Sequence, residues 1–278
     1  MVHGINSIYS ITFDDILLSP AFSNVKPKDA ITSVNIGNFN LHVPIISAAM
    51  DTVTENKMAI GIALCGGLGV IHRNMSIEKQ AKEIQKVKNY KLHNSSFSNS
   101  TLDKKKRLLV GAAIGVENNA MPRLIKILAA EVDIIFIDVA HAHTKTTLDF
   151  IKIVKKKIKK TPLIVGNIAT KEAALALIKL GVDGIKVGIG PGSICTTRVV
   201  TGVGVPQLSA IIDVYKVASK YKIPVIADGG IKTSADISKA IAGGATACMM
   251  GSLLAGADES PGKLLKIKGK KYKSYRGM

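Results

Sequence analysis

The sequence has 278 residues, enough for one large hydrophobic core and within the usual size of a single α/β barrel. Hydrophobic residues make up 47% of the chain, with 4% aromatics and no Trp, which favours aliphatic strands packed in layers over an aromatic-rich sandwich. No apolar run approaches the roughly 20 residues that span a bilayer, and the N-terminus lacks the pattern of a signal peptide. We therefore expect neither membrane insertion nor secretion.

The formal net charge is +18, and the lysines concentrate at 104–107, 152–160 and 263–273. Four aliphatic residues are interleaved with the second cluster: Ile151, Ile153, Val154 and Ile158. This pattern predicts a helix with an apolar stripe and a solvated lysine face. No aromatic platform for single-stranded nucleic acid accompanies the lysines. The charge therefore indicates a general attraction for anionic nucleotides, and nucleic-acid binding is not expected as a main role.

The three cysteines, Cys65, Cys195 and Cys248, are an odd number without paired spacing. This argues against a disulfide framework or a zinc site and indicates a reducing, cytoplasmic setting. Cys65 lies in a predicted apolar helix and Cys248 in a predicted strand, so both are expected in the core.

After an irregular lead-in of about forty residues, apolar strands, loops and amphipathic helices alternate along the chain. Strands are predicted at 44–48, 68–71, 108–114, 133–138, 162–168, 184–187, 223–228 and 246–250. Helices are predicted near 54–65, 76–88, 118–130, 145–160, 171–180, 206–221 and 235–243. Ser76, Thr170 and Ser234 are predicted N-caps, and Gly181 and Gly243 are predicted to end helices.

Eight strands that alternate with helices predict a parallel (β/α)8 TIM barrel, with residues 1–278 forming a single catalytic barrel domain. A doubly wound open sheet is the alternative, but no Gly-x-Gly-x-x-Gly follows the first strand. Residues 89–106 are polar and serine-rich, and we expect them to form a flexible linker.

The stretch from Lys186 to Arg198 carries the most distinctive pattern. A short buried strand at 184–187 is followed by three glycines and a proline, which stop the strand and allow close approach of a ligand. Cys195 then stands on a loop at the carboxyl end of the strand, where a thiol is placed for attack. The alternative is a glycine-rich turn whose cysteine only fills space.

Polar and glycine residues also follow the predicted seventh and eighth strands, where barrels commonly bind phosphate. These residues are Asp228, Gly229, Gly230, Gly251 and Ser252. Their amides and hydroxyl, together with Ser193, suit phosphate, whereas the Asp228 carboxylate suits ribose hydroxyls. A nucleoside monophosphate is therefore the economical ligand, with tight packing as the other explanation for the glycines. Asn167, at the end of the fifth strand, is expected either to face the base or to bond along the barrel rim.

The run Gly-Ile-Gly-Pro-Gly-Ser-Ile-Cys-Thr-Thr-Arg at 188–198 resembles the active-site signature of the IMP dehydrogenase and GMP reductase family. Further matches extend along nearly the whole chain. They are Phe-Asp-Asp-Ile-Leu-Leu from 13, Ser-Ala-Ala-Met-Asp-Thr-Val-Thr-Glu from 47, Gly-Gly-Leu-Gly-Val-Ile-His from 66, Ala-Asp-Gly-Gly-Ile from 227, Met-Gly-Ser-Leu-Leu-Ala-Gly from 250 and Tyr-Arg-Gly-Met from 275.

This resemblance implies that Cys195 attacks carbon 2 of the hypoxanthine ring of IMP, that NAD⁺ accepts hydride and that xanthosine monophosphate forms by hydrolysis. A thiol suits the role because its thiolate is strongly nucleophilic. Thr197 is expected to hold the hydrolytic water. The substrate phosphate and base are expected to contact Tyr275, Arg276, Gly277 and Met278.

For the cofactor, the resemblance implies that Asp138 binds the nicotinamide ribose, with Gly188, Ile189 and Gly190 on the same side. Many dehydrogenases of the family have Ser where Val139 stands, which puts the cofactor contact at that position in question. The main-chain carbonyls of Gly190, Gly192 and Cys195 are expected to bind a potassium ion.

The resemblance also implies a homotetramer. Most of the dehydrogenases carry a regulatory CBS insert where residues 89–106 stand, and this insert is absent here. The family continues past the last residue of this sequence with a mobile flap, which supplies an Arg that activates water, and with a closing helix.

Two other functions remain open on the sequence alone. GMP reductase shares the cysteine loop and deaminates GMP with NADPH. Val139 and the missing insert favour this function. Ile194, Val199, Val200 and the run at 225–231 lean towards the dehydrogenase. A catalytically silent barrel that only binds purine nucleotides is the third reading.

Overall fold

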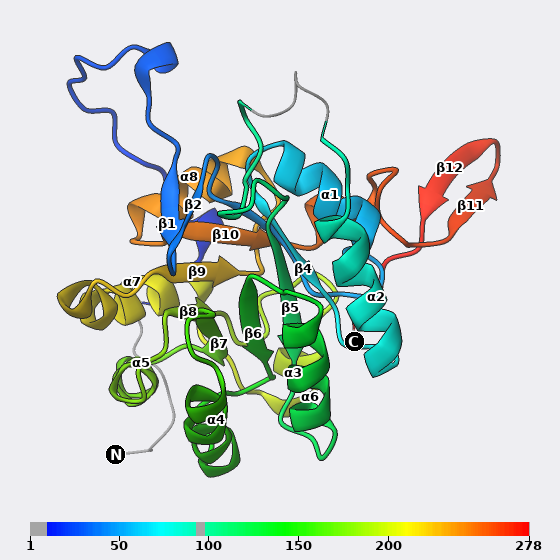
Figure 1. Cartoon of the computed structure of the whole chain (residues 1–278). Coiled ribbons are helices and arrows are strands. Elements are labelled where there is room, and N and C mark those ends of the chain that lie inside the picture. The colour runs from blue at the N-terminus through cyan, green and yellow to red at the C-terminus, as the bar shows by residue number, and fades with distance from the viewer. Residues whose placement is uncertain (1–9, 93–97, 278) are drawn as a thin grey trace.

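The protein, described here by a computed structural model of residues 10–92 and 98–277, is built around a closed barrel of eight parallel strands. The strands follow the order β10-β3-β4-β5-β6-β7-β8-β9 around the barrel (Figure 1). They are β3 (Ile45–Ser47), β4 (Leu68–Ile71), β5 (Val110–Ile114), β6 (Ile134–Asp138), β7 (Leu163–Ile168), β8 (Gly184–Val187), β9 (Val225–Asp228) and β10 (Ala247–Met250). The predicted (β/α)8 barrel is confirmed, and each strand lies inside its predicted range.

Helices surround the barrel on its outer side (Figure 1). They are α1 (Asn56–Leu64), α2 (Ile77–Lys88), α3 (Ala120–Ala129), α4 (Lys145–Lys157), α5 (Lys171–Lys179), α7 (Gln207–Ala218) and α8 (Ser234–Ala242). Six of these lie inside their predicted ranges, and α8 begins one residue earlier than predicted. In the described part of the chain, no helix combines the length and apolar character that crossing a membrane requires.

The strand side chains divide between two buried clusters, as the twofold alternation of a strand requires. The inner cluster fills the barrel and includes Val70, Ile134, Phe136, Ile164 and Met249, each 2% exposed or less. The outer cluster joins the other strand faces to the apolar stripes of the helices. Because the chain contains few aromatic residues, branched aliphatic side chains supply most of this packing.

Several short elements were not predicted. The hairpin of β1 (Val34–Ile36) and β2 (Phe39–Leu41) places Ile36 and Leu41, both 0% exposed, in the inner cluster. The other additions are η1 (Phe13–Asp15), η2 (Pro27–Asp29), α6 (Thr197–Thr201), α9 (Ser252–Ala255), β11 (Leu264–Ile267) and β12 (Lys270–Lys273). A short 3-10 helix, η4 (Ser219–Tyr221), occupies the end of the helix predicted at 206–221. The hairpin of β11 and β12 projects from the barrel (Figure 1). Three to five residues give too short a pattern for sequence periodicity to detect.

Two sequence predictions about the core are wrong. Ile151, Val154 and Ile158 are buried, but Ile153 is 52% exposed, because the helical period places it on the lysine face of α4. Cys65 is exposed at the C-terminal end of α1. Cys248 is buried in β10 as expected, and burial raises the pKa of its thiol to about 12.

The segment expected to form a flexible linker, 89–106, makes defined contacts in its second half, while residues 93–97 lie outside the described part. The Thr101 amide donates to the Ala63 carbonyl at 2.8 Å. The Asp103 carboxylate forms ion pairs with Lys88 and Arg107, each at 2.9 Å. These bonds attach residues 101–103 to α1, α2 and the start of β5.

The N-cap of α8 is Thr233 rather than the predicted Ser234. The Thr233 hydroxyl accepts a hydrogen bond from the Asp236 amide at 3.3 Å, and the Asp236 carboxylate accepts one from the Thr233 amide at 3.0 Å. This reciprocal arrangement is a capping box, and it satisfies two backbone donors at the helix start.

We predict that Thr233→Ala lowers the free energy of unfolding by about 1 kcal/mol, because it removes the side-chain acceptor of the cap. Ser234→Ala is the matched control and should change the stability much less. Urea unfolding followed by circular dichroism measures both variants. Equal losses in the two variants would contradict the assignment of the cap.

Candidate active site

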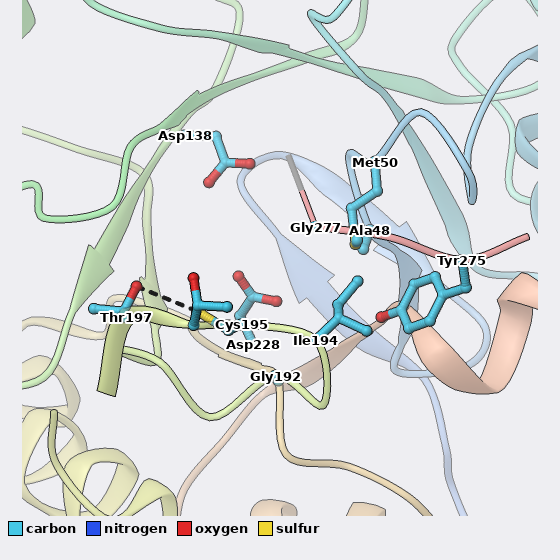
Figure 2. Close-up of a pocket in the computed structure, with 13 residues that line it drawn as sticks. Ala48, Met50, Asp138, Gly192, Ile194, Cys195, Thr197, Asp228, Tyr275 and Gly277 are labelled. Atoms are coloured by element: carbon cyan, nitrogen blue, oxygen red, sulfur yellow. Dashed lines mark hydrogen bonds between the residues drawn. The ribbon is translucent and has the colours of Figure 1, made fainter. Parts of the chain in front are cut away.

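The candidate site lies at the carboxyl ends of the barrel strands, where a cavity of about 560 Å³ opens. The lining comes from the segments after β3, β8, β9 and β10, from Asp138 at the end of β6, and from Tyr275 and Gly277. Figure 2 shows Asp138, Cys195 and Asp228 around this cavity, with Tyr275 beside Ile194 on the side away from Thr197. A second cavity of about 360 Å³ adjoins it and shares Asp138, Cys195 and Asp228.

The loop after β8 begins with a close approach to β9. A Cβ atom at Gly188, whose φ is +150°, would lie 2.1 Å from the Asp228 carbonyl oxygen, so only glycine fits there. The Gln207 side-chain amide donates to the Val187 carbonyl at 2.9 Å and to the Asp228 carbonyl at 3.1 Å. These contacts fix the base of the loop against the end of β9.

Arg198 holds the middle of the same loop. Its guanidinium donates to the Ile189 carbonyl at 3.1 Å and to the Val205 carbonyl at 2.5 Å. A Cβ atom at Gly190 would lie 2.7 Å from the Arg198 side chain, and the φ of Gly190 is +70°. Close packing therefore requires glycine at positions 188 and 190, and the absence of a side chain there also leaves the main chain accessible to a ligand.

Cys195 is exposed and lines both cavities, so it is not a space-filling residue of a turn. Its amide donates to the Gly192 carbonyl at 3.0 Å, and its thiol donates to the Thr197 hydroxyl at 3.3 Å (Figure 2). Thr197 is the first residue of α6 and also lines both cavities. An exposed thiol that lines an open cavity is accessible to a ligand and can act there as a nucleophile.

The polar floor of the site centres on Lys186, which is 2% exposed within β8. Its ammonium donates to Asp138 at 2.8 Å, to Asp228 at 2.5 Å and to the Asn167 side-chain oxygen. Burial alone would lower the pKa of Lys186, but the two carboxylates outweigh this effect and raise the pKa. The lysine therefore stays charged beneath the cavity.

Asn167 joins this network instead of projecting freely. Its side-chain amide donates to the Gly188 carbonyl at 2.7 Å and to the Asp228 carboxylate at 2.9 Å. It lines the second cavity and not the first. These contacts match the rim hydrogen bonding that the sequence left open as one of its two roles.

The residues predicted to bind phosphate differ in whether they line the larger cavity. Gly229 and Gly251 line the larger cavity, and Gly230 and Ser252 are their chain neighbours. The exposed Ser193 hydroxyl is hydrogen-bonded to Tyr275. Burial is the main cause that raises the pKa of the Tyr275 hydroxyl, so this group stays neutral at physiological pH.

The segment 275–277 closes one side of the cavity, and Met278 lies outside the described residues. Arg276 is not among the residues that line the cavity, and its guanidinium pairs with Asp51 at 2.5 Å. Burial alone would raise the pKa of Asp51, but hydrogen bonds from Arg276 and Asn74 hold it below its ordinary value. The ion pair attaches the segment to the loop after β3.

The predicted cofactor residues gather at the second cavity. Asp138, Val139, Gly188 and Gly190 line it, whereas the Ile189 side chain is only 7% exposed and its carbonyl is taken by Arg198. Sequence reasoning missed Lys186, Arg198 and Gln207. The signal for Lys186 was present, since a lysine inside a short aliphatic strand must find partners when buried.

Comparison with known proteins identifies a family for this site. A family model described as the IMP dehydrogenase / GMP reductase domain matches residues 10–278. The chain is 45% identical to an inosine-5′-monophosphate dehydrogenase of Borreliella burgdorferi over 97% of its length and 75% of that protein. It is 48% identical to that of Cryptosporidium parvum, covering 96% and 73%, and 40% identical to that of Methanocaldococcus jannaschii, covering 96% and 76%.

We predict that Gly188→Ala costs more than about 2 kcal/mol of unfolding free energy, because the new Cβ would collide with the Asp228 carbonyl. Gly202→Ala is the control for backbone strain alone. Gly202 has a φ of +69°, and no atom lies within 4 Å of the point that its Cβ would occupy, so its loss should be about 1 kcal/mol. Urea unfolding measures both, and a smaller loss at position 188 would refute the close approach.

Proposed function

The chain belongs to the IMP dehydrogenase / GMP reductase family, and from that premise we propose that it oxidises inosine 5′-monophosphate to xanthosine 5′-monophosphate. The observation that carries the proposal is an exposed Cys195 thiol in a cavity whose other walls are two carboxylates, glycine amides and Tyr275. These groups are suited to act as a nucleophile, as acceptors for ribose hydroxyls and as donors to a phosphate, and they line one cavity. This reaction supplies the precursor for guanine nucleotides.

The nucleotide is proposed to occupy the larger cavity. Asp228 accepts hydrogen bonds from the ribose hydroxyls through the carboxylate oxygen that Lys186 leaves unused. The phosphate is bound by main-chain amides at Gly229, Gly230 and Gly251 and by hydroxyls of Ser193, Ser252 and Tyr275. The base is then directed towards Cys195, with Gly277 beside it.

Catalysis is proposed to begin when the Cys195 thiolate forms a bond to carbon 2 of the hypoxanthine ring. The hydrogen on that carbon leaves as hydride, and NAD⁺ supplies the acceptor. The resulting thioimidate between Cys195 and the purine is cleaved by water, which transfers oxygen to carbon 2 and returns the thiol. The Thr197 hydroxyl is proposed to orient the attacking water, and its distance of 3.3 Å from the Cys195 sulfur supports this role.

The second cavity suits the nicotinamide end of the cofactor. The free oxygen of Asp138 would accept hydrogen bonds from a ribose, and Gly188 and Gly190 leave the main chain accessible on the same side. Ile189 contributes its backbone to this side and turns its side chain into the core. Val139 lines the cavity without a hydroxyl, so Asp138 carries the polar contact.

A potassium ion is proposed to bind the main-chain carbonyl oxygens of Gly190, Gly192 and Cys195, because hard cations prefer oxygen ligands. The Gly192 carbonyl accepts the Cys195 amide hydrogen at 3.0 Å and keeps a second lone pair for an ion. When bound, the ion would supply electrostatic support to the cysteine loop.

GMP reductase activity is the nearest alternative, and the valine at position 139 is the feature that favours it. Three relatives that cover nearly the whole chain carry the name inosine-5′-monophosphate dehydrogenase, which supports the dehydrogenase. A nucleotide-binding barrel without catalysis is the alternative of another class. This alternative assigns no function to the exposed Cys195 thiol in the cavity.

We also infer a homotetramer in the cytoplasm. Side chains of the segment before β1 are strongly exposed, including Leu17 at 88%, Phe22 at 97% and Ile31 at 88%. This segment extends away from the barrel (Figure 1). A neighbouring subunit would cover these apolar groups. All three cysteines are free, which suits a reducing compartment.

We predict that the protein reduces NAD⁺ in the presence of IMP and does not oxidise NADPH in the presence of GMP. The absorbance of the reduced cofactor follows both reactions. Oxidation of NADPH with GMP would establish the reductase instead. Nucleotide binding without either reaction would establish the silent barrel.

We predict that Cys195→Ala lowers kcat by more than about 10³-fold while IMP still binds, because the nucleophile is lost and the cavity is kept. Cys65→Ala is the matched control, since Cys65 is an exposed cysteine outside the cavity. Mass spectrometry of protein incubated with IMP and NAD⁺ should locate a nucleotide adduct on the peptide that contains Cys195. Normal turnover by Cys195→Ala would exclude the covalent mechanism.

A further inference from the structure

A single buried ammonium, that of Lys186, binds the two aspartates that line both cavities of the site. Lys186 extends from β8, and its three side-chain acceptors come from the ends of β6, β7 and β9: Asp138, Asn167 and Asp228. These four strands are consecutive neighbours in the barrel. The ammonium therefore gathers polar groups from three strand ends around one point.

The charges explain why this arrangement needs a lysine. Two carboxylates that share one point repel each other, and a buried ammonium without partners is strongly disfavoured. Together they form a compact ion cluster in which each group offsets the cost of burying the others. The carboxylates are 25% and 20% exposed, so their outer sides face the cavities while the lysine is covered.

The geometry of the bonds assigns one oxygen of each carboxylate to the lysine. Lys186 binds Oδ1 of Asp138 and Oδ2 of Asp228. Within the described residues, the other oxygen of each carboxylate is not bonded to a protein side chain, and both aspartates line both cavities. The lysine thus sets the orientation in which Asp138 and Asp228 meet a ligand.

We propose that Lys186 is a positioning residue that holds Asp138 for the cofactor ribose and Asp228 for the substrate ribose at the same time. This inference rests on the proposed function, because it uses the two ribose assignments made there. It extends the proposed function by making both nucleotide sites depend on one residue. Loss of the lysine disturbs both nucleotide sites, whereas loss of either carboxylate disturbs mainly one.

The chain contains a matched control in Lys88. This lysine is 3% exposed and pairs with Asp133 at 2.7 Å and with Asp103 at 2.9 Å. It also donates to the Leu108 carbonyl at 3.0 Å, just before β5 begins, so it lies at the opposite end of the barrel from the cavities. It has the same buried lysine and paired aspartates, and neither Asp103 nor Asp133 lines the two cavities of the candidate site.

The experiment compares Lys186→Met, Lys186→Gln and Lys88→Met with the unaltered protein. KM is measured separately for IMP and NAD⁺, and calorimetry measures the equilibrium binding of each nucleotide. Lys186→Met should raise both KM values, and weaken binding of both nucleotides, by about tenfold or more. Lys186→Gln keeps a side-chain donor and should fold even if the methionine variant does not, with a smaller loss in the same two quantities.

Lys88→Met should lower the midpoint of thermal unfolding and leave both KM values within about twofold of the unaltered protein. Asp138→Asn and Asp228→Asn complete the comparison, since the first should affect mainly NAD⁺ and the second mainly IMP. Unchanged nucleotide binding in the Lys186 variants, or an equal effect of Lys88→Met, would overturn the proposal. Calorimetry decides this point even if the unaltered protein fails to turn over IMP, a result that would instead count against the proposed reaction.

Discussion

The parallel pairing of β10 with β3 closes the sheet, and the site depends on this closure. Cys248 lies opposite Ile45 and Met249 opposite Ile46, and the Ala48 amide continues the pairing to the Met250 carbonyl at 2.9 Å. The two segments are about two hundred residues apart in the chain. Their pairing brings Met50, Gly251 and Tyr275 to one cavity wall, while β6, β8 and β9 supply the opposite wall.

A second constraint acts within the wall that carries the nucleophile. The chain after β8 passes so close to the end of β9 that Gly188 has no room for a side chain. Gln207 bonds the carbonyls of both strands, and Arg198 secures the loop further on. Cys195 is therefore on an exposed loop with a rigid base, which suits a nucleophile that must meet a ring at a fixed position.

The two buried lysines show how position determines the role of one physical pattern. Lys88 and Lys186 each satisfy an ammonium with two aspartates. At the amino end of the barrel the cluster fastens the segment around Asp103 to α2 and β5. At the carboxyl end the same chemistry leaves carboxylate oxygens facing a cavity, because loops of that end enclose space for a ligand.

The sequence by itself determined the barrel, the order of its strands and helices, and the loop that carries Cys195. Local periodicity and runs of adjacent residues are enough to predict these features. It also placed Asp138 and Asp228 at strand ends. It did not determine that Lys186 joins them, that Arg276 pairs with Asp51, or that Ile36 and Leu41 enter the inner core. It also misplaced Cys65, whose exposure depends on packing rather than on residue type, whereas the exposure of Ile153 follows from the helical period of α4. These features arise between residues far apart in the chain, so only the closed tertiary structure decided them.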